Sequence, residues 1–213
     1  MNQIIVGELT VAADASQRNQ RALAKQRTRE KILAAARRLF AERGYEGATI
    51  RDIARSAGMS TGAVFASFAD KADLFGEILE AEQATLRETL ATAAVGKSGL
   101  AAVTAMFAAA VDLHMSELAL FQAGMAAMWT PGLATQLRRR LDRRPVTPLI
   151  AAAVNQDLGC GEARIDALQT AGLMWEAYAA ALRRAATDGL TAEAVKAQLP
   201  ARFATILAGA RRS

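Results

Sequence analysis

The sequence contains few of the residues from which disulfide frameworks, metal centres and β-sheets are built. With one cysteine and one histidine in 213 residues, a disulfide framework is excluded and a Cys/His metal site is not expected. Four prolines are present, and apart from the short patch Ile4–Val6 no stretch shows sustained alternation of β-branched residues. Segments rich in Ala, Leu, Arg and Glu are present instead, and they predict an all-α protein with about nine helices.

Motifs for cofactors, metals and membrane insertion are also missing. No apolar stretch approaches the length of a membrane span without an interruption, and the N-terminus lacks a basic region followed by a long apolar core. We therefore expect a cytoplasmic protein with no membrane partner, no cofactor, no metal and no catalytic residues. Cys160 lies between two glycines in a predicted loop, where an incidental residue is favoured over a redox-sensing thiol.

Positive charge is concentrated in the N-terminal third of the chain. The whole sequence has a net charge of +5, but residues 18–71 contain twelve Lys and Arg against five Asp and Glu, so the remainder carries a charge of −2. A strongly basic segment is the electrostatic pattern of a protein that binds a phosphate backbone. A merely basic, soluble surface is the alternative interpretation of the charge alone.

The segment Thr49–Phe68 has the features of a complete helix-turn-helix. Thr49 is an N-cap candidate, and Asp52 places a carboxylate in the first turn, where the helix dipole favours it. Gly58 can adopt the positive φ that ends a helix, and Ser60 can cap the next one. The apolar positions expected in the core of this segment are Ile53, Ala54, Ala57, Met59, Val64 and Phe68. Two short helices joined by a tight glycine turn, the second with a free outer face, fit a DNA major groove; an ordinary helical hairpin is the alternative.

Helices are predicted on both sides of this segment. Upstream, apolar residues recur at helical spacing before Gly44 stops the helix, and downstream Asp70 caps a helix with an apolar stripe. This succession of helix, Gly-Tyr-x-x-x-Thr, helix-turn-helix, aromatic residue and x-x-Lys resembles the TetR/AcrR family of bacterial transcriptional regulators over about Arg27–Leu79. The rest of the chain agrees with the family in length and helical character.

The resemblance implies a homodimeric, ligand-responsive repressor that places the helix Thr61–Phe68 in a half-site of a double-stranded DNA operator. The expected DNA-binding residues are Thr49, Arg51, Ser67 and Lys71 for phosphates, the cap Ser60, and Thr61, Gly62, Ala63 and Phe65 facing base edges. Family members usually carry a Tyr and then a His or Tyr where this chain has Phe65 and Ser67. Since Phe65 cannot donate a hydrogen bond and Ser67 has a shorter reach, we expect altered contacts to the DNA backbone.

Three regions are predicted along the chain. Residues 1–24 are expected to form a disordered tail and basic arm, residues 25–80 the helix-turn-helix domain, and residues 81–213 a helical domain for effector binding and dimerisation. The basic residues of the arm and of the helix that follows, which can reach DNA or be solvated, are Arg18, Arg21, Lys25, Arg27 and Arg29. Helices of the body are predicted over about 71–95, 100–116, 117–129, 133–144, a segment after Pro148 toward Asn155, 162–187 and 191–211.

The last two predicted helices, 162–187 and 191–211, are apolar over more than one face and therefore need cover on two sides. Their stripes run through Gly172 and Phe203, while Pro200 should kink the second helix. A symmetric four-helix bundle, with two helices from each subunit, would supply the second cover. TetR-like proteins generally dimerise through their last two helices, so the resemblance implies the same here.

Methionine and aromatic side chains are frequent in the middle helices, where they suit an adaptable cavity as well as an ordinary core. The resemblance implies a small, often hydrophobic effector. The candidate lining residues are Met106, Phe107, His114, Phe121, Met125, Met128, Trp129, Met174, Trp175 and Tyr178. His114 is the polar group that could orient a ligand. The Arg138–Arg144 cluster is interpreted as a solvated face, with a site for an anionic ligand or acidic partner as the alternative.

Two other functions stay open at this point. A DNA-binding dimer could be governed by a protein partner or by no effector at all. An α-helical enzyme that acts on the ligand is disfavoured, because the sequence has no cofactor or metal motif and offers no nucleophile–base pair around His114.

Overall fold

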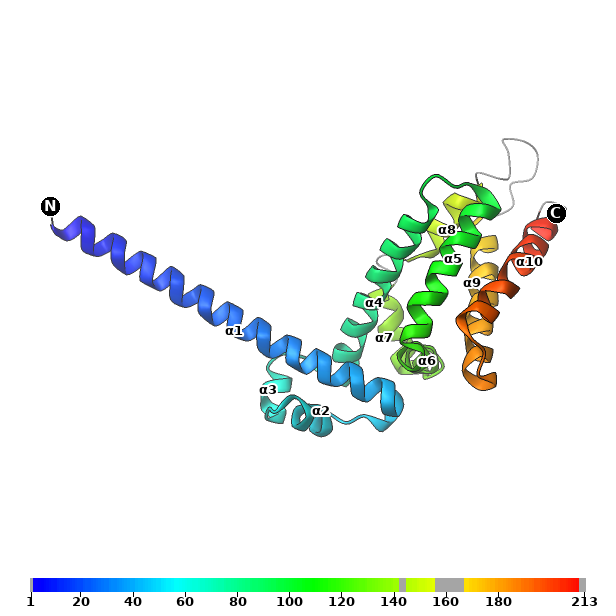
Figure 1. Ribbon diagram of the computed structural model, residues 1–213. Helices are drawn as coiled ribbons and strands as arrows, with labels where there is room; N and C mark the ends of the chain where they lie inside the picture. The colour runs from blue at the N-terminus through cyan, green and yellow to red at the C-terminus, as the bar shows by residue number, and fades with distance from the viewer. Residues whose placement is uncertain (1, 142–144, 156–166, 211–213) are drawn as a thin grey trace. The chain divides into compact units, whose positions relative to one another are not determined.

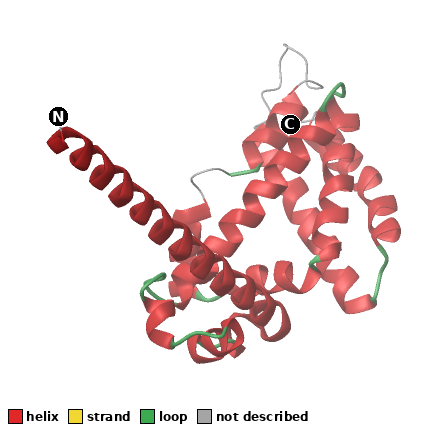
Figure 2. Ribbon diagram, turned by 60° about the vertical axis from the view of Figure 1, so that its left-hand side comes forward, coloured by secondary structure: helices red, strands yellow, loops and turns green. Residues whose placement is uncertain are grey.

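The computed structural model describes residues 2–141, 145–155 and 167–210, and within these ranges it contains helices and no strand (Figures 1 and 2). The predicted all-α fold is therefore confirmed, with ten helices over the described residues. Their bounds are α1 Asn2–Gly47, α2 Ile50–Ala57, α3 Thr61–Phe65, α4 Lys71–Ala94, α5 Gly99–Ser116, α6 Leu118–Ala127, α7 Pro131–Leu141, α8 Thr147–Asn155, α9 Ala167–Asp188 and α10 Ala192–Ala210. The chain divides into a first unit, Met1–Phe75, and a second unit, Gly76–Ser213.

Helix α1 takes the place of the disordered tail predicted for residues 1–24. The structure describes one helix that starts at Asn2 and includes this whole segment. The segment has no proline and a single glycine, Gly7, and its Ala, Gln, Leu and Arg residues favour a helix. Near the other end, Gly44 has φ 68° and ψ 178°, which interrupts the helix at the residue predicted to stop it.

The core of the first unit is aromatic at the point where α1 meets the start of α4. The Phe40 ring lies 4.6 Å from the Phe75 ring, edge to face, and Tyr45 lies 5.1 Å from Phe75 between ring centroids. Helix α2 packs against α1 and contributes the buried Ile53. The short helix α3 packs against α2, while its residues Thr61, Gly62 and Phe65 stay exposed to solvent.

The second unit is built around α5, which packs against α8, α9 and α10. Phe107 of α5 is fully buried, with ring centroids 4.7 Å from Phe203 of α10 and 5.0 Å from Tyr178 of α9. We expected no apolar stretch long enough to cross a membrane. Among the described helices, however, Gly99–Ser116 is long and apolar enough to do so. Its position in the core of the unit accounts for its apolar character.

The body helices lie close to their predicted ranges. Helix α10 includes Pro200, which was predicted to kink it, and continues beyond it to Ala210. Several predicted features, among them Cys160, the start of the helix predicted over 162–187, and the last two arginines of the 138–144 cluster, lie outside the described residues.

Candidate nucleic-acid interface and ligand cavity

Side-chain and backbone caps hold α2 and α3 in a helix-turn-helix. The Thr49 hydroxyl accepts a hydrogen bond from the Asp52 N–H at 3.1 Å and donates to the Asp52 carboxylate at 2.8 Å. Gly58 ends α2 with φ 69° and ψ 35°, a left-handed conformation that glycine adopts without strain. Ser60 then caps α3 by accepting from the Ala63 N–H at 3.2 Å.

Helix α3 has one face in the core and one face in solvent. Val64 is fully buried and Phe68 is nearly so, whereas Thr61 and Gly62 are exposed and Phe65 is 56% exposed. The helix is shorter than predicted, since it ends at Phe65 and a turn leads from there to Phe68. The outer face therefore offers a hydroxyl, a bare backbone segment and an aromatic ring.

Arg29 anchors the end of this turn to α1, a role that the sequence analysis missed. Its guanidinium lies 4.1 Å from the centroid of the Phe68 ring and donates to the Ser67 carbonyl oxygen at 2.5 Å. Arg29 was predicted as a basic residue that reaches DNA or is solvated. Its spacing from Ile32, one turn further along α1 and buried, is the signal that could have placed it on the packed face.

Lys71, predicted to contact a phosphate, forms hydrogen bonds inside the first unit. Its ammonium donates to the carbonyl oxygens of Tyr45 at 2.9 Å and Ala48 at 3.3 Å, and it lies 4.1 Å from the centroid of the Tyr45 ring. It thereby ties the first turn of α4 to the last turn of α1 and to the loop before α2.

The other predicted DNA-binding residues divide into two groups. The hydroxyl of Ser67 donates to the Ala63 carbonyl at 3.2 Å, and the hydroxyl of Thr49 is engaged in the cap of α2. Ala63 and Ser67 are half-buried. The exposed residues of the predicted set whose side chains remain open to DNA are Arg51, Thr61, Gly62 and Phe65, together with the exposed cap Ser60. Met59, expected to be buried, is half-buried because it belongs to the turn itself.

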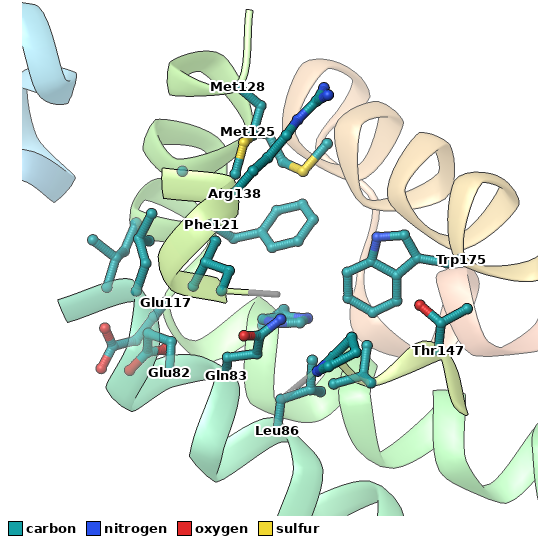
Figure 3. Close-up of a pocket in the computed structure, with 17 residues that line it drawn as sticks. Glu82, Gln83, Leu86, Glu117, Phe121, Met125, Met128, Arg138, Thr147 and Trp175 are labelled. Carbon is teal, nitrogen blue, oxygen red and sulfur yellow. The ribbon is translucent and has the colours of Figure 1, made fainter. Parts of the chain in front are cut away.

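The second unit contains a cavity of about 370 Å³ (Figure 3). Its wall is formed by residues of α4, α5, α6, α7 and α9 and by the segment that leads into α8. The lining residues are Leu79, Glu82, Gln83, Leu86, His114, Glu117, Leu120, Phe121, Gly124, Met125, Met128, Arg138, Leu141, Pro145, Val146, Thr147 and Trp175. The volume lies within the range of small-molecule sites, and most of these side chains are apolar.

Five of the ten predicted effector-binding residues line this cavity: His114, Phe121, Met125, Met128 and Trp175. Four others, Met106, Phe107, Met174 and Tyr178, are fully buried in the core instead. Trp129 is 82% exposed, because it follows the end of α6. The α4 and α7 sides of the wall were missed, since their lining residues are neither aromatic nor methionine.

His114, which lines the cavity, forms a buried polar pair with Tyr178 of the core. The His114 Nδ1 atom lies 2.5 Å from the Tyr178 hydroxyl oxygen. Burial lowers the pKa of His114 from 6.5 to about 4, because the charged imidazolium would lose its hydration. Burial also raises the pKa of Tyr178 above its usual value. Both groups are therefore neutral at pH 7.

The Arg138–Arg144 cluster is not uniformly a solvated face. Arg140 of α7 forms a hydrogen-bonded ion pair with Glu80 at 2.7 Å and lies 3.5 Å from Glu77, both on α4. Gly76 makes room for this contact, because a Cβ there would lie 3.0 Å from Arg140 Cδ. Arg138 lines the cavity and Arg139 is exposed.

The residues exposed on α9 and α10 are not the ones that the sequence predicted for the dimer interface. Phe203 is fully buried against Phe107, so its stripe packs into the core of its own unit and does not face outward. On α9 the exposed large apolar residues are Leu168 and Leu173, and a Cβ added at Gly172 beside them would meet no atom within 4 Å.

Comparison with known proteins agrees with this architecture. The family model described as bacterial regulatory proteins, tetR family, matches residues 32–78. The transcriptional repressor AcnR from Corynebacterium efficiens is 46% identical over 63 residues, which are 30% of this chain and 34% of AcnR. The transcriptional regulator AcrR from Shigella flexneri is 41% identical over 63 residues, 30% of this chain and 29% of AcrR. The aligned segment thus spans about a third of the length of these curated relatives.

The likeness in fold extends beyond the aligned segment. The crystal structure of a transcriptional regulator from Rhodococcus sp. Rha1, 24% identical, matches with a TM-score of 0.69 over 86% of this chain and 97% of that chain. The capped helix-turn-helix, the matching family model and the shared all-helical body lead to one assignment. Residues 32–78 form a helix-turn-helix domain that matches the TetR family of bacterial regulatory proteins, and the described chain as a whole shares the all-helical fold of a solved transcriptional regulator.

Proposed function

We propose that this protein regulates transcription by inserting α3 into the major groove of an operator. The supporting observation is the division of α3 into a fixed inner face and a free outer face. Val64 and Phe68 are buried, while Thr61, Gly62 and Phe65 are exposed on a helix whose turn is set by Gly58. The family consists of regulators and not of enzymes, which sets aside the helical enzyme.

In this proposal the exposed residues contact DNA and the internally bonded ones position them. Arg51 and the backbone around Ser60 contact phosphates, and Thr61, Gly62 and Phe65 face base edges. Because only Thr61 among these three has a polar side chain, sequence preference rests largely on thymine methyl groups and DNA shape. Thr49, Ser67 and Lys71 fix the geometry of the helix-turn-helix through the hydrogen bonds described above.

Selecting genomic fragments that bind the purified protein tests this proposal and yields the operator. Replacing Thr61 should then change sequence preference more than affinity for random DNA, whereas Arg51→Ala should weaken both alike. Arg139→Ala removes the same charge from an exposed site of the second unit and serves as the matched control. Equal effects of the two arginine variants on DNA affinity would contradict the proposed interface.

We further propose that the regulator is a homodimer and that the outer side of α9 contributes to the interface. Exposed Leu168 and Leu173 lie near Gly172 on α9, where an added Cβ would meet no atom within 4 Å. Burying two leucines against a symmetric copy would stabilise the pair through the hydrophobic effect. A dimer would engage two half-sites about 34–36 Å apart, or a multiple of that spacing.

Finally, we propose that an effector in the cavity releases the repressor from DNA in the cytoplasm. The cavity supports this function over control by a protein partner alone. Helix α4 starts in the first unit and continues without interruption into the second, where Leu79, Glu82 and Leu86 line the cavity. A ligand that prefers the free dimer must weaken operator binding by the same factor, typically about 5- to 150-fold.

The direct test is a screen of apolar and amphipathic compounds for release of labelled operator DNA. Gly124→Phe should abolish release and leave DNA binding intact, because a Cβ at Gly124 already lies 3.1 Å from Leu79 across the cavity wall. If no compound releases the DNA and none binds the isolated protein, the DNA-binding function stands and the effector function is withdrawn.

A further inference from the structure

The hydrogen bond between His114 and Tyr178 determines which nitrogen of the imidazole carries the proton. The Tyr178 side chain is fully buried, and among the described residues its hydroxyl has His114 Nδ1 as its hydrogen-bond partner. If Nδ1 donated to the phenol oxygen, the phenol proton would be buried without an acceptor, which is unfavourable. The Tyr178 O–H therefore donates to Nδ1, and the neutral ring carries its own proton on Nε2.

The Nε2–H group is available to a ligand. No hydrogen bond joins it to a described residue, yet no buried side-chain nitrogen or oxygen of the described chain lacks a partner. Nε2 is therefore not sealed inside protein, although the His114 side chain as a whole is only 8% exposed. The accessible space that His114 lines is the cavity, so its Nε2–H is a donor at the cavity wall, beside the polar groups of Gln83, Arg138, Thr147 and Trp175.

Around this donor the wall is mainly apolar. Figure 3 shows Phe121 and Trp175 facing the same space, with Met125 and Met128 beside them. Glu82 and Glu117 lie on the side opposite Trp175, with their carboxylates directed away from the space. Among the described lining residues two are acidic and one is an arginine, Arg138, so these residues carry no excess of positive charge with which to hold an anion.

We propose that the cavity selects uncharged, apolar molecules bearing a carbonyl oxygen, such as a ketone or an ester, which accepts a hydrogen bond from His114 Nε2–H. This inference rests on the proposed effector function and specifies its ligand class. Tyr178 acts as a positioning residue, because it fixes the imidazole in the tautomer that donates into the cavity.

The tautomer can be observed without any ligand, because His114 is the only histidine of the chain. A long-range ¹H–¹⁵N correlation spectrum of the ¹⁵N-labelled protein distinguishes a protonated from an unprotonated ring nitrogen. We expect a protonated Nε2 and an unprotonated Nδ1 at pH 7. A protonated Nδ1, or a doubly protonated ring, would overturn the inference and leave the DNA-binding proposal unaffected.

The ligand class is tested with a matched pair of probes, benzophenone and diphenylmethane, which differ in one carbonyl group. Calorimetric titration should show benzophenone binding about 2- to 10-fold more tightly, the effect of one neutral hydrogen bond. The double variant His114→Phe/Tyr178→Phe removes both partners and leaves no orphaned polar group, so it should fold and lose this preference. The anion 4-benzoylbenzoate should bind the native protein more weakly than benzophenone.

The outcomes separate the two proposals. Equal affinity for the matched pair, a preference that persists in the double variant, or tighter binding of the anion would overturn the carbonyl inference while the cavity remains a ligand site. Failure of both neutral probes to bind the native protein would overturn the effector cavity itself and the ligand class with it.

Discussion

Lowering the pH from 7 to 5 should destabilise the protein through His114. In the folded state burial lowers the pKa of this imidazole from 6.5 to about 4, so the folded protein keeps it neutral across that interval. An unfolded chain exposes the same group to water and protonates it near pH 6.5. Because the unfolded state binds one more proton between these pKa values, the free energy of unfolding falls as the pH falls.

The size of the effect follows from the two pKa values. Between pH 7 and pH 5 the linkage relation gives a loss of about 2 kcal/mol, and the full loss approaches about 3 kcal/mol near pH 4. The loss is large against a typical domain stability of about 5–15 kcal/mol. Above pH 7 His114 is neutral in both states and contributes no pH dependence.

Urea denaturation at a series of pH values, at one fixed protein concentration because a dimer is proposed, measures this dependence. The double variant His114→Phe/Tyr178→Phe is the reference, since it contains no histidine and retains every carboxylate. Subtracting its pH profile removes the titration of Asp and Glu common to both proteins. Parallel profiles for the two proteins between pH 5 and pH 7 would refute the buried, neutral imidazole.

Three further predictions concern the DNA interface, the dimer and the cavity. Arg51→Ala should reduce the slope of log affinity against log salt by about one unit in a filter-binding series. Gly172→Arg should yield a folded monomer by light scattering, because the site has open space, whereas Phe203→Arg should unfold the chain by burying an unpaired charge. A folded dimer of Gly172→Arg would rule out that face. Gly124→Phe should lower the affinity for benzophenone by about 10-fold or more, because the added ring covers apolar cavity surface that the ligand would otherwise bury. An unchanged affinity would place the ligand elsewhere.

The helix-turn-helix could be predicted almost residue by residue, because its signals are local. Caps and turn glycines act within three or four positions of the chain, so Thr49, Gly58 and Ser60 are recognisable without any knowledge of tertiary contacts. The same local logic failed for the first 24 residues. There the chain has no stop signal, and a segment with good helix formers was predicted as disordered but forms helix.

The cavity was half predicted because its wall combines helices that are distant in the sequence. Bulky residues of α6 and Trp175 were identified by their type, but a residue's type does not say whether it faces a cavity or the core. Phe107 and Phe203 illustrate the difference, since both are aromatic at helical spacing and they pack against each other. The α4 side of the wall depends on which helices meet, and one sequence does not contain that information.

The arginines and lysines show why a charge count predicts a function better than it predicts the residues that perform it. The net charge of residues 18–71 favoured DNA binding, yet two of the cations in this segment, Arg29 and Lys71, are engaged with aromatic rings and backbone carbonyls. A cation bound to rings and carbonyl groups stabilises the geometry of the helix-turn-helix, and its positive charge still attracts phosphates at long range. Replacing Lys71 should therefore weaken both the packing of the helix-turn-helix domain and its attraction for phosphates. The effect on DNA affinity has to be compared with that of replacing Arg51, which is exposed.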